Sequence, residues 1–271
     1  MDPLAIAQLF ERLHDFFIAA GFALARMTGV IMVMPAFTRV GATGMLRPAI
    51  ALALALPLMP ALVQAITGAQ LTAMMIVVLL LKEMIVGVLI GIVLGVPFWA
   101  AEAAGDVLDL QRGSTAASLI DPLAMTEESI TGTLFGLAMV ALYFASGGLP
   151  LTLRTIYDSY ALWPAPALLP IFGASAPQLF VGLLDTIITM GLVLVAPIVV
   201  CLLLADLVLA LVSRASPHLN VFALVLSVKN LAFAVLLVLY CAFLIDYMGG
   251  DLKSLLRAGG DLEAIRAATP P

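Results

Sequence analysis

The sequence predicts an all-α, polytopic membrane protein. Hydrophobic residues make up 63% of the 271 residues, charged residues only 11%, and the mean hydropathy is +1.18. A soluble domain of this length cannot bury so much apolar side chain in one core. The formal net charge of -5 excludes the basic surface that a nucleic-acid-binding protein needs for phosphates. We therefore expect the apolar residues to contact membrane lipid or the helices of other subunits.

Six apolar segments are long enough to cross or enter the membrane as helices, since about 20 apolar residues span the hydrocarbon. We expect them at about 16–37, 48–66, from 71 to beyond Pro97, 130–144, 179–212 and 221–247. The first ends near Pro35, and Pro57 and Pro60 interrupt the second. The segments form one helical domain, 1–247, and a short polar tail, 248–271, which begins as a short exposed helix.

The third and fifth segments are too long for a perpendicular crossing, and each contains a proline, Pro97 or Pro197. A proline inside a helix removes one backbone hydrogen bond and favours a bend. At membrane depth the freed carbonyl must be satisfied by protein or trapped water, so we expect bent helical hairpins packed against other subunits. Gly87, Gly91 and Gly95 lie on one face of the third segment and predict close helix packing there.

A polar strip follows Pro97. Glu102, Asp106 and Asp109 are spaced i, i+4 and i+7, so they share one face of a helix that continues past the proline, and Arg112 can pair with Asp109. The spacing fits a helix that has left the bilayer and exposes a solvated face. It fits equally well a functional group of carboxylates at the edge of the hydrocarbon.

Small residues directly after the strip favour the functional interpretation. They are Gly113, Ser114, Thr115, Ala116, Ala117 and Ser118. Such residues suit a deformable loop and anchor a helix poorly, so this composition predicts a movable constriction. Asp121 and Pro122 then predict a turn, and Thr126 or Ser129 can cap the fourth helix.

A second polar cluster joins the last two segments. Asp206 and Lys229 lie in apolar surroundings, and Arg214 and Asn220 flank Pro217. A break at this proline predicts a helical hairpin with polar residues at its tip. Asp206 can be neutralised within the hairpin, by Lys229 or Arg214, or by a neighbouring chain, and the sequence leaves both possibilities open.

The connector between the fourth and fifth segments contains Tyr157, Tyr160 and Trp163, which are typical of the membrane interface. We expect a short amphipathic turn at 151–162. No catalytic or metal site is predicted, because His14 and His218 are far apart and neither belongs to a metal-ligand motif. We therefore expect no enzyme activity, metal or cofactor.

The two polar clusters resemble one known family. The run FWAAEAAGDVLDLQRGSTAASLIDP, and the residues Arg214, Pro217, Leu219, Asn220, Val221, Phe222 and Lys229, are similar to the T subunit of the type III secretion export gate. The flagellar counterpart of that subunit is FliR. The similarity covers nearly the whole chain. His218 departs from the pattern, because the family more often has glutamine there.

The resemblance implies a multi-pass protein of the bacterial inner membrane, within the secretion basal body. It implies a hetero-oligomer with R and S subunits, together with the U subunit, through which unfolded protein substrates pass. It also implies that one segment lies in the channel and helps plug it when closed. In this sequence that segment is Asp109, Leu110, Gln111, Arg112, Gly113, Ser114, Thr115, Ala116, Ala117, Ser118, Leu119, Ile120 and Asp121.

Two other classes of function compete with this expectation. A secondary transporter for a small solute also has broken helices and charges within the membrane, but typically shows paired repeats, and none is convincing here. An intramembrane enzyme would need a nucleophile, base or metal site, for which the two histidines are insufficient.

Overall fold

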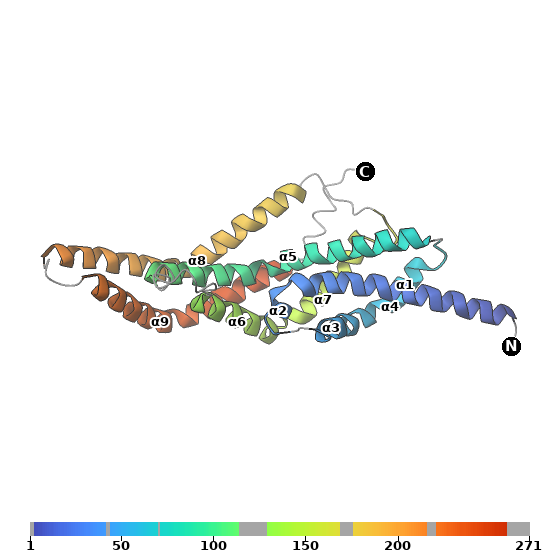
Figure 1. Ribbon diagram of the computed structural model, residues 1–271, viewed down its shortest axis with the longest axis horizontal. Coiled ribbons are helices and arrows are strands. Elements are labelled where there is room, and N and C mark those ends of the chain that lie inside the picture. The colour runs from blue at the N-terminus through green and yellow to red at the C-terminus, as the bar shows by residue number, and fades with distance from the viewer. Residues whose placement is uncertain are drawn as a thin grey trace. The chain divides into compact units, whose positions relative to one another are not determined.

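The computed structural model describes residues 3–41, 44–69, 71–113, 129–168, 176–215 and 221–258, and every regular element in these ranges is a helix. The helices are α1 (Pro3–Val33), α2 (Pro35–Thr38), α3 (Leu46–Ala55), α4 (Met59–Ile66), α5 (Ala73–Arg112), α6 (Ile130–Ala145), α7 (Gly148–Leu162), α8 (Ala176–Ala215) and α9 (Val221–Ala258) (Figure 1). Within the described residues, five helical segments are long and apolar enough to cross a membrane, or six if α6 and α7 count as one bent span. The predicted all-α polytopic fold is confirmed.

Prolines set several helix boundaries as the sequence predicted. α1 ends at Val33, just before Pro35, and a 3₁₀ turn, η1 (Leu56–Leu58), contains Pro57 and separates α3 from α4. α5 and α8 each continue as one helix through Pro97 and Pro197, respectively. Each of these helices is 40 residues long, and the proline inside it has no backbone N–H to donate.

The chain forms two compact units, each described here by itself. The first comprises the described residues within 1–95, 147–181 and 255–258. In it α1 packs on α3 and α4 and runs parallel to the first part of α5. A Cβ atom on Gly87 would collide with the carbonyl of Arg26, and one on Gly91 would lie 3.0 Å from the carbonyl oxygen of Val30. Gly87 and Gly91 thus bring two helix backbones into contact, as predicted for this pattern.

The second unit comprises the described residues within 96–146 and 182–254, that is, the end of α5, α6, most of α8 and most of α9. Its helices also meet at glycines. A Cβ atom on Gly105 would collide with the backbone of Gly132, and one on Gly191 would lie 2.9 Å from the carbonyl oxygen of Ala100. The rings of Phe98 and Tyr143 pack edge to face with centroids 5.5 Å apart.

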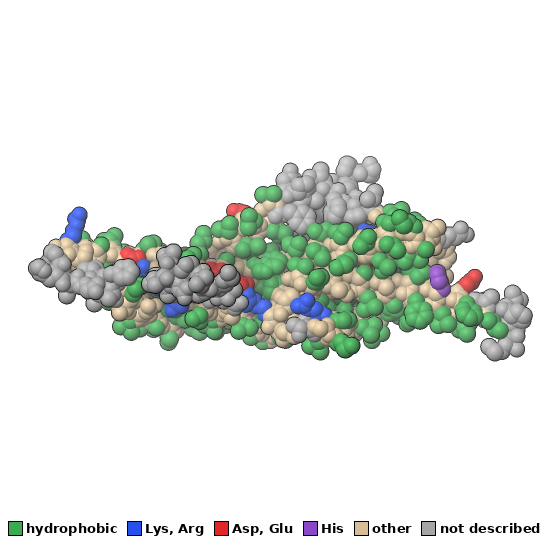
Figure 2. All heavy atoms as spheres, in the orientation of Figure 1, with side chains coloured by type: hydrophobic (Ala, Val, Ile, Leu, Met, Phe, Trp, Pro, Cys, Tyr) green, Lys and Arg blue, Asp and Glu red, His purple; other side chains and the backbone are tan. Residues whose placement is uncertain are grey.

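Large apolar side chains remain exposed on both units, and Figure 2 shows hydrophobic side chains over most of the displayed surface. On α9, Leu231, Val238 and Leu239 are each at least 69% exposed. In water such surfaces would cause association. They are therefore the surfaces that lipid or other protein chains cover.

Candidate functional site

The carboxylate of Asp109 joins the last turns of α5 to the first turn of α6. It accepts hydrogen bonds from Ser129 Oγ at 2.8 Å, from the backbone N–H of Thr131 at 3.1 Å, and from Thr131 Oγ1. Arg112, one turn further along α5, donates to it through Nε at 2.9 Å. Asp109 is only 2% exposed. We call this set of contacts the Asp109 clamp.

The Asp109 clamp also satisfies the N-terminus of α6. Ser129 is the N-cap, and its Oγ accepts the backbone N–H of Gly132 at 2.8 Å, which confirms one of the two caps predicted. A carboxylate at this end interacts favourably with the partial positive charge of the helix. The clamp thus ties Asp109 and Arg112, near the end of α5, to Ser129 and Thr131 at the start of α6.

The predicted polar face of α5 lies beside the start of α6. A Cβ atom on Gly132 would collide with Asp106 Oδ1 and lie 3.1 Å from the carbonyl oxygen of Glu102. Asp109 is buried, Glu102 is partly buried and Asp106 is exposed. The face is therefore neither wholly solvated nor wholly buried.

The remaining residues of the expected plug are only partly described. Leu110 is 64% exposed, Gln111 is partly buried, and Gly113 has a positive φ of 77°, which favours glycine. Arg112 lies over the ring of Phe233 on α9, with 4.8 Å from Cζ to the ring centroid. The other residues of the expected plug lie outside the described residues; they are Ser114, Thr115, Ala116, Ala117, Ser118, Leu119, Ile120 and Asp121.

The second predicted cluster forms an ion pair between α8 and α9. Lys229 Nζ donates to Asp206 Oδ2 at 2.9 Å, and the side chains are 10% and 36% exposed, respectively. Of the pairings that the sequence left open, the structure thus contains the one with Lys229. Arg214 is exposed at the end of α8, and Pro217 and Asn220 lie outside the described residues.

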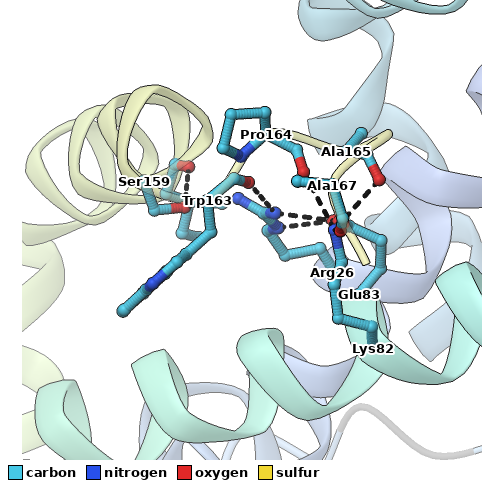
Figure 3. Close-up of polar contacts among 9 residues, drawn as sticks. Arg26, Lys82, Glu83, Ser159, Trp163, Pro164, Ala165 and Ala167 are labelled. Atoms are coloured by element: carbon cyan, nitrogen blue, oxygen red, sulfur yellow. Dashed lines mark hydrogen bonds and ion pairs between the residues drawn. The ribbon is translucent and has the colours of Figure 1, made fainter. Parts of the chain in front are cut away.

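A third group of charges, in the first unit, was not predicted as a site. Arg26 on α1 is completely buried and donates to Glu83 on α5 through Nε at 2.7 Å and Nη2 at 3.0 Å. Its Nη1 donates to Ser159 Oγ at 2.8 Å, and Nη2 also donates to the carbonyl of Trp163 at 2.8 Å. Figure 3 shows these side chains converging from three parts of the chain.

Lys82, which precedes Glu83, binds the turn after α7. Its Nζ donates to the carbonyl oxygens of Pro164 and Ala165 at 2.9 Å each and of Ala167 at 3.0 Å, and lies 2.7 Å from Glu83 Oε1 (Figure 3). We call Arg26, Lys82, Glu83 and their main-chain acceptors the Arg26 cluster. It contains two cations and one carboxylate, so main-chain carbonyls supply the remaining negative partial charge.

The aromatic residues of the connector lie inside the first unit. Trp163 is 6% exposed, Tyr157 Oη donates to the carbonyl of Leu54 at 2.9 Å, and the ring of Tyr160 lies 3.5 Å from the guanidinium of Arg26. The sequence predicted an interfacial position for them. Their depth in the membrane stays a prediction; within the unit Tyr160 and Trp163 contact Arg26, and an aromatic face stabilises a buried guanidinium.

Comparison with known proteins identifies the family to which the chain belongs. The sequence profile of the bacterial export proteins, family 1, matches residues 17–255, which include all three groups of charges. The chain belongs to this family. In it, Yop proteins translocation protein T of Yersinia pestis is 36% identical over 146 residues, which are 54% of this chain and 56% of that protein.

Two further relatives extend the comparison. Secretion system apparatus protein SsaT of Salmonella typhimurium is 32% identical over 148 residues, 55% of this chain and 56% of the relative. Flagellar biosynthetic protein FliR of Bacillus subtilis is 29% identical over 158 residues, 58% of this chain and 60% of the relative. The chain thus matches little more than half the length of these relatives. The resemblance to the T subunits of type III secretion is confirmed.

Proposed function

We propose that this protein is a structural subunit of a bacterial protein-export gate and helps form a channel for unfolded protein substrates. The observation that carries the proposal is the family match over residues 17–255, together with relatives whose names refer to translocation, secretion and flagellar biosynthesis. Such a role needs surfaces for other chains, and the exposed apolar sides of α8 and α9 supply them. The role requires no catalytic residue or cofactor.

The assembly is proposed to lie in the inner membrane, within the secretion basal body, and to contain R and S subunits and the U subunit. An ion pair such as Asp206–Lys229 supports a position among protein chains, since a charged pair at a partly exposed site within apolar helices is costly against lipid alone.

Segment 109–121 is proposed to act as the plug of the closed channel. The Asp109 clamp supports this role because it fixes the start of α6, which follows segment 114–128, to the end of α5, while residues 114–118 are small. A loop with fixed ends and small side chains can change its packing without unfolding the helices that carry it. Opening then needs no covalent step.

Co-expression with R and S subunits tests the assembly. The detergent-extracted particle is purified through a tag on this chain, and its mass is measured. We expect a stoichiometric particle containing all three subunits. A solute transporter would instead be extracted as a monomer or a symmetric dimer, and that result would refute the proposal.

Dye leakage tests the plug. Particles in vesicles carry either the wild-type segment or a variant in which residues 114–118 are deleted, and dye efflux is recorded. We expect faster efflux from the deletion variant, because fewer residues then fill the channel. A matched control removes no plug residue: Gly182→Ala, whose added Cβ meets open space. Unchanged efflux from the deletion variant in an intact particle would exclude the plug.

A further inference from the structure

The turn that follows α7 has more hydrogen-bond acceptors than donors. Residues 163–167 read WPAPA, and Pro164 and Pro166 have no backbone N–H. The five residues therefore carry five carbonyl oxygens but only three N–H groups. One of these, the N–H of Ala167, donates within the turn to the carbonyl of Pro164 at 3.1 Å. We call residues 163–167 the proline turn.

Much of the proline turn is enclosed by the first unit. Trp163 is 6% exposed and Ala165 is 1% exposed. α7 ends at Leu162, so its regular backbone hydrogen bonds stop where the turn begins. A buried carbonyl without a partner is costly, and the turn has too few N–H groups of its own. Donors from elsewhere in the unit are therefore needed to hold the turn in place.

Lys82 on α5 supplies three of these donors. A lysine ammonium has three N–H groups, and here each has a carbonyl oxygen of the turn as its partner. The distances from Nζ are 2.9 Å to Pro164, 2.9 Å to Ala165 and 3.0 Å to Ala167. Figure 3 shows the three carbonyls gathered around the end of the Lys82 side chain. The ammonium therefore matches the acceptors that the two prolines leave in excess.

Ion pairing alone does not explain the position of Lys82. Arg26 and Glu83 already form a completely buried pair, with N···O distances of 2.7 and 3.0 Å. Lys82 is only 7% exposed, and it gives this pair one positive charge in excess. A buried charge without a counter-ion is costly. Carbonyl oxygens can offset that cost, because they replace the water around a cation, as they do in ion channels.

We propose that the proline turn is an ammonium-binding site whose built-in ligand is Lys82. The ammonium fixes the turn on α5 and so sets the point at which the chain leaves α7. The competing explanation is that apolar packing holds the turn, and that Lys82 is an excess charge which the unit tolerates. The two explanations differ in sign. Removal of the ammonium loosens the turn if Lys82 is its ligand, and otherwise leaves the turn unchanged or more stable. The inference concerns the first unit and does not depend on the proposed function.

Amide hydrogen exchange of the full chain in nanodiscs tests the proposal. The reporter is the N–H of Ala167, whose hydrogen bond lies within the turn. Lys82→Ala removes the ammonium and three carbon atoms, and Lys82→Met keeps an unbranched apolar side chain but no charge. We expect exchange at Ala167 to become at least about tenfold faster in both variants. The matched control, Lys229→Met, removes a lysine from the second unit and should change this exchange less than about twofold.

Chemical rescue of Lys82→Ala separates charge from packing. n-Propylammonium replaces the missing atoms and should return exchange at Ala167 to within about twofold of the wild type, whereas neutral n-propanol should not. If Lys82→Ala is extracted only as unfolded chain, the amine present during extraction should restore the folded form. Unchanged or slower exchange in Lys82→Met would overturn the proposal. Rescue by n-propanol as strong as by the amine, or no rescue by the amine, would also overturn it.

Discussion

Replacing Glu83 by glutamine should destabilise the first unit by about 3–5 kcal/mol, the typical cost of removing one partner from a buried ion pair. Glu83 is fully buried and accepts from Arg26 at 2.7 and 3.0 Å and lies 2.7 Å from Lys82. The glutamine side chain has the same shape but no charge. It therefore leaves two neighbouring cations out of water without a counter-ion.

Arg26→Met removes one of the two cations that contact Glu83. Alone, this replacement removes the hydrogen bonds to Ser159 and Trp163 but leaves the ion pair of Lys82 and Glu83, whose net charge is zero. It should therefore lower the free energy of unfolding less than Glu83→Gln does. Combined with Glu83→Gln, it leaves a single cation, Lys82, with its three carbonyl acceptors. The double variant should consequently be no less stable than Glu83→Gln alone, with a coupling of at least about 1.5 kcal/mol.

The free energy of unfolding can be followed by denaturant titration of the purified chain in detergent, using the fluorescence of Trp163 beside the cluster with Trp99→Phe in all variants. Tyr160→Phe is the matched control, because Tyr160 Oη is buried with no hydrogen-bond partner among the described residues and its removal should be nearly neutral. Additive losses in the double variant, or a loss below 1 kcal/mol for Glu83→Gln, would refute the proposed charge balance.

Three further predictions concern the second unit. Asp109→Asn should lower the free energy of unfolding by about 1–3 kcal/mol and increase proteolysis between α5 and α6, because charge-assisted hydrogen bonds to the start of α6 are lost; equal cleavage rates would contradict this. Gly132→Ala should lower the denaturant midpoint clearly more than Gly182→Ala, because the added Cβ collides with Asp106 Oδ1 at position 132 and meets open space at position 182; equal midpoints would show that α6 can shift freely. Lys229→Glu should reduce co-extraction with partner subunits by bringing a carboxylate next to Asp206, and the added reversal Asp206→Lys should restore it; normal co-extraction of the single variant would argue against the pair.

Helix positions were largely predictable because their signals are local. The apolar runs placed α5, α6, α8 and α9, Pro35 marked the end of α1, and Ser129 was one of two caps expected for α6. The pairing of Arg112 with Asp109 followed from its spacing on one helix. The partners of Asp109 on α6 could not be predicted from spacing, because Ser129 and Thr131 come 20 and 22 residues later.

The Arg26 cluster shows what sequence patterns miss. One signal was present, because Lys82 and Glu83 interrupt the longest apolar run of the chain, and charges there are rarely exposed to lipid. Most of the site, however, consists of carbonyl oxygens at 163–167, and every residue type has a carbonyl. Only the fold reveals which carbonyls lack a partner and where a cation can reach them.

The two buried charge groups follow one electrostatic rule. α7 ends at Leu162, and the carbonyls just after it, at the negative end of the helix, face the cations Arg26 and Lys82. α6 begins at Ile130, and the backbone N–H of Thr131 in its first turn, at the positive end, donates to the anion Asp109. In both places the charge has the opposite sign to the partial charge of a helix end, and at α6 it also satisfies a backbone N–H that the helix itself leaves unpaired. Reversal of sign, as in Asp109→Lys, should therefore be worse than neutralisation, because it adds repulsion from the helix end to the loss of hydrogen bonds.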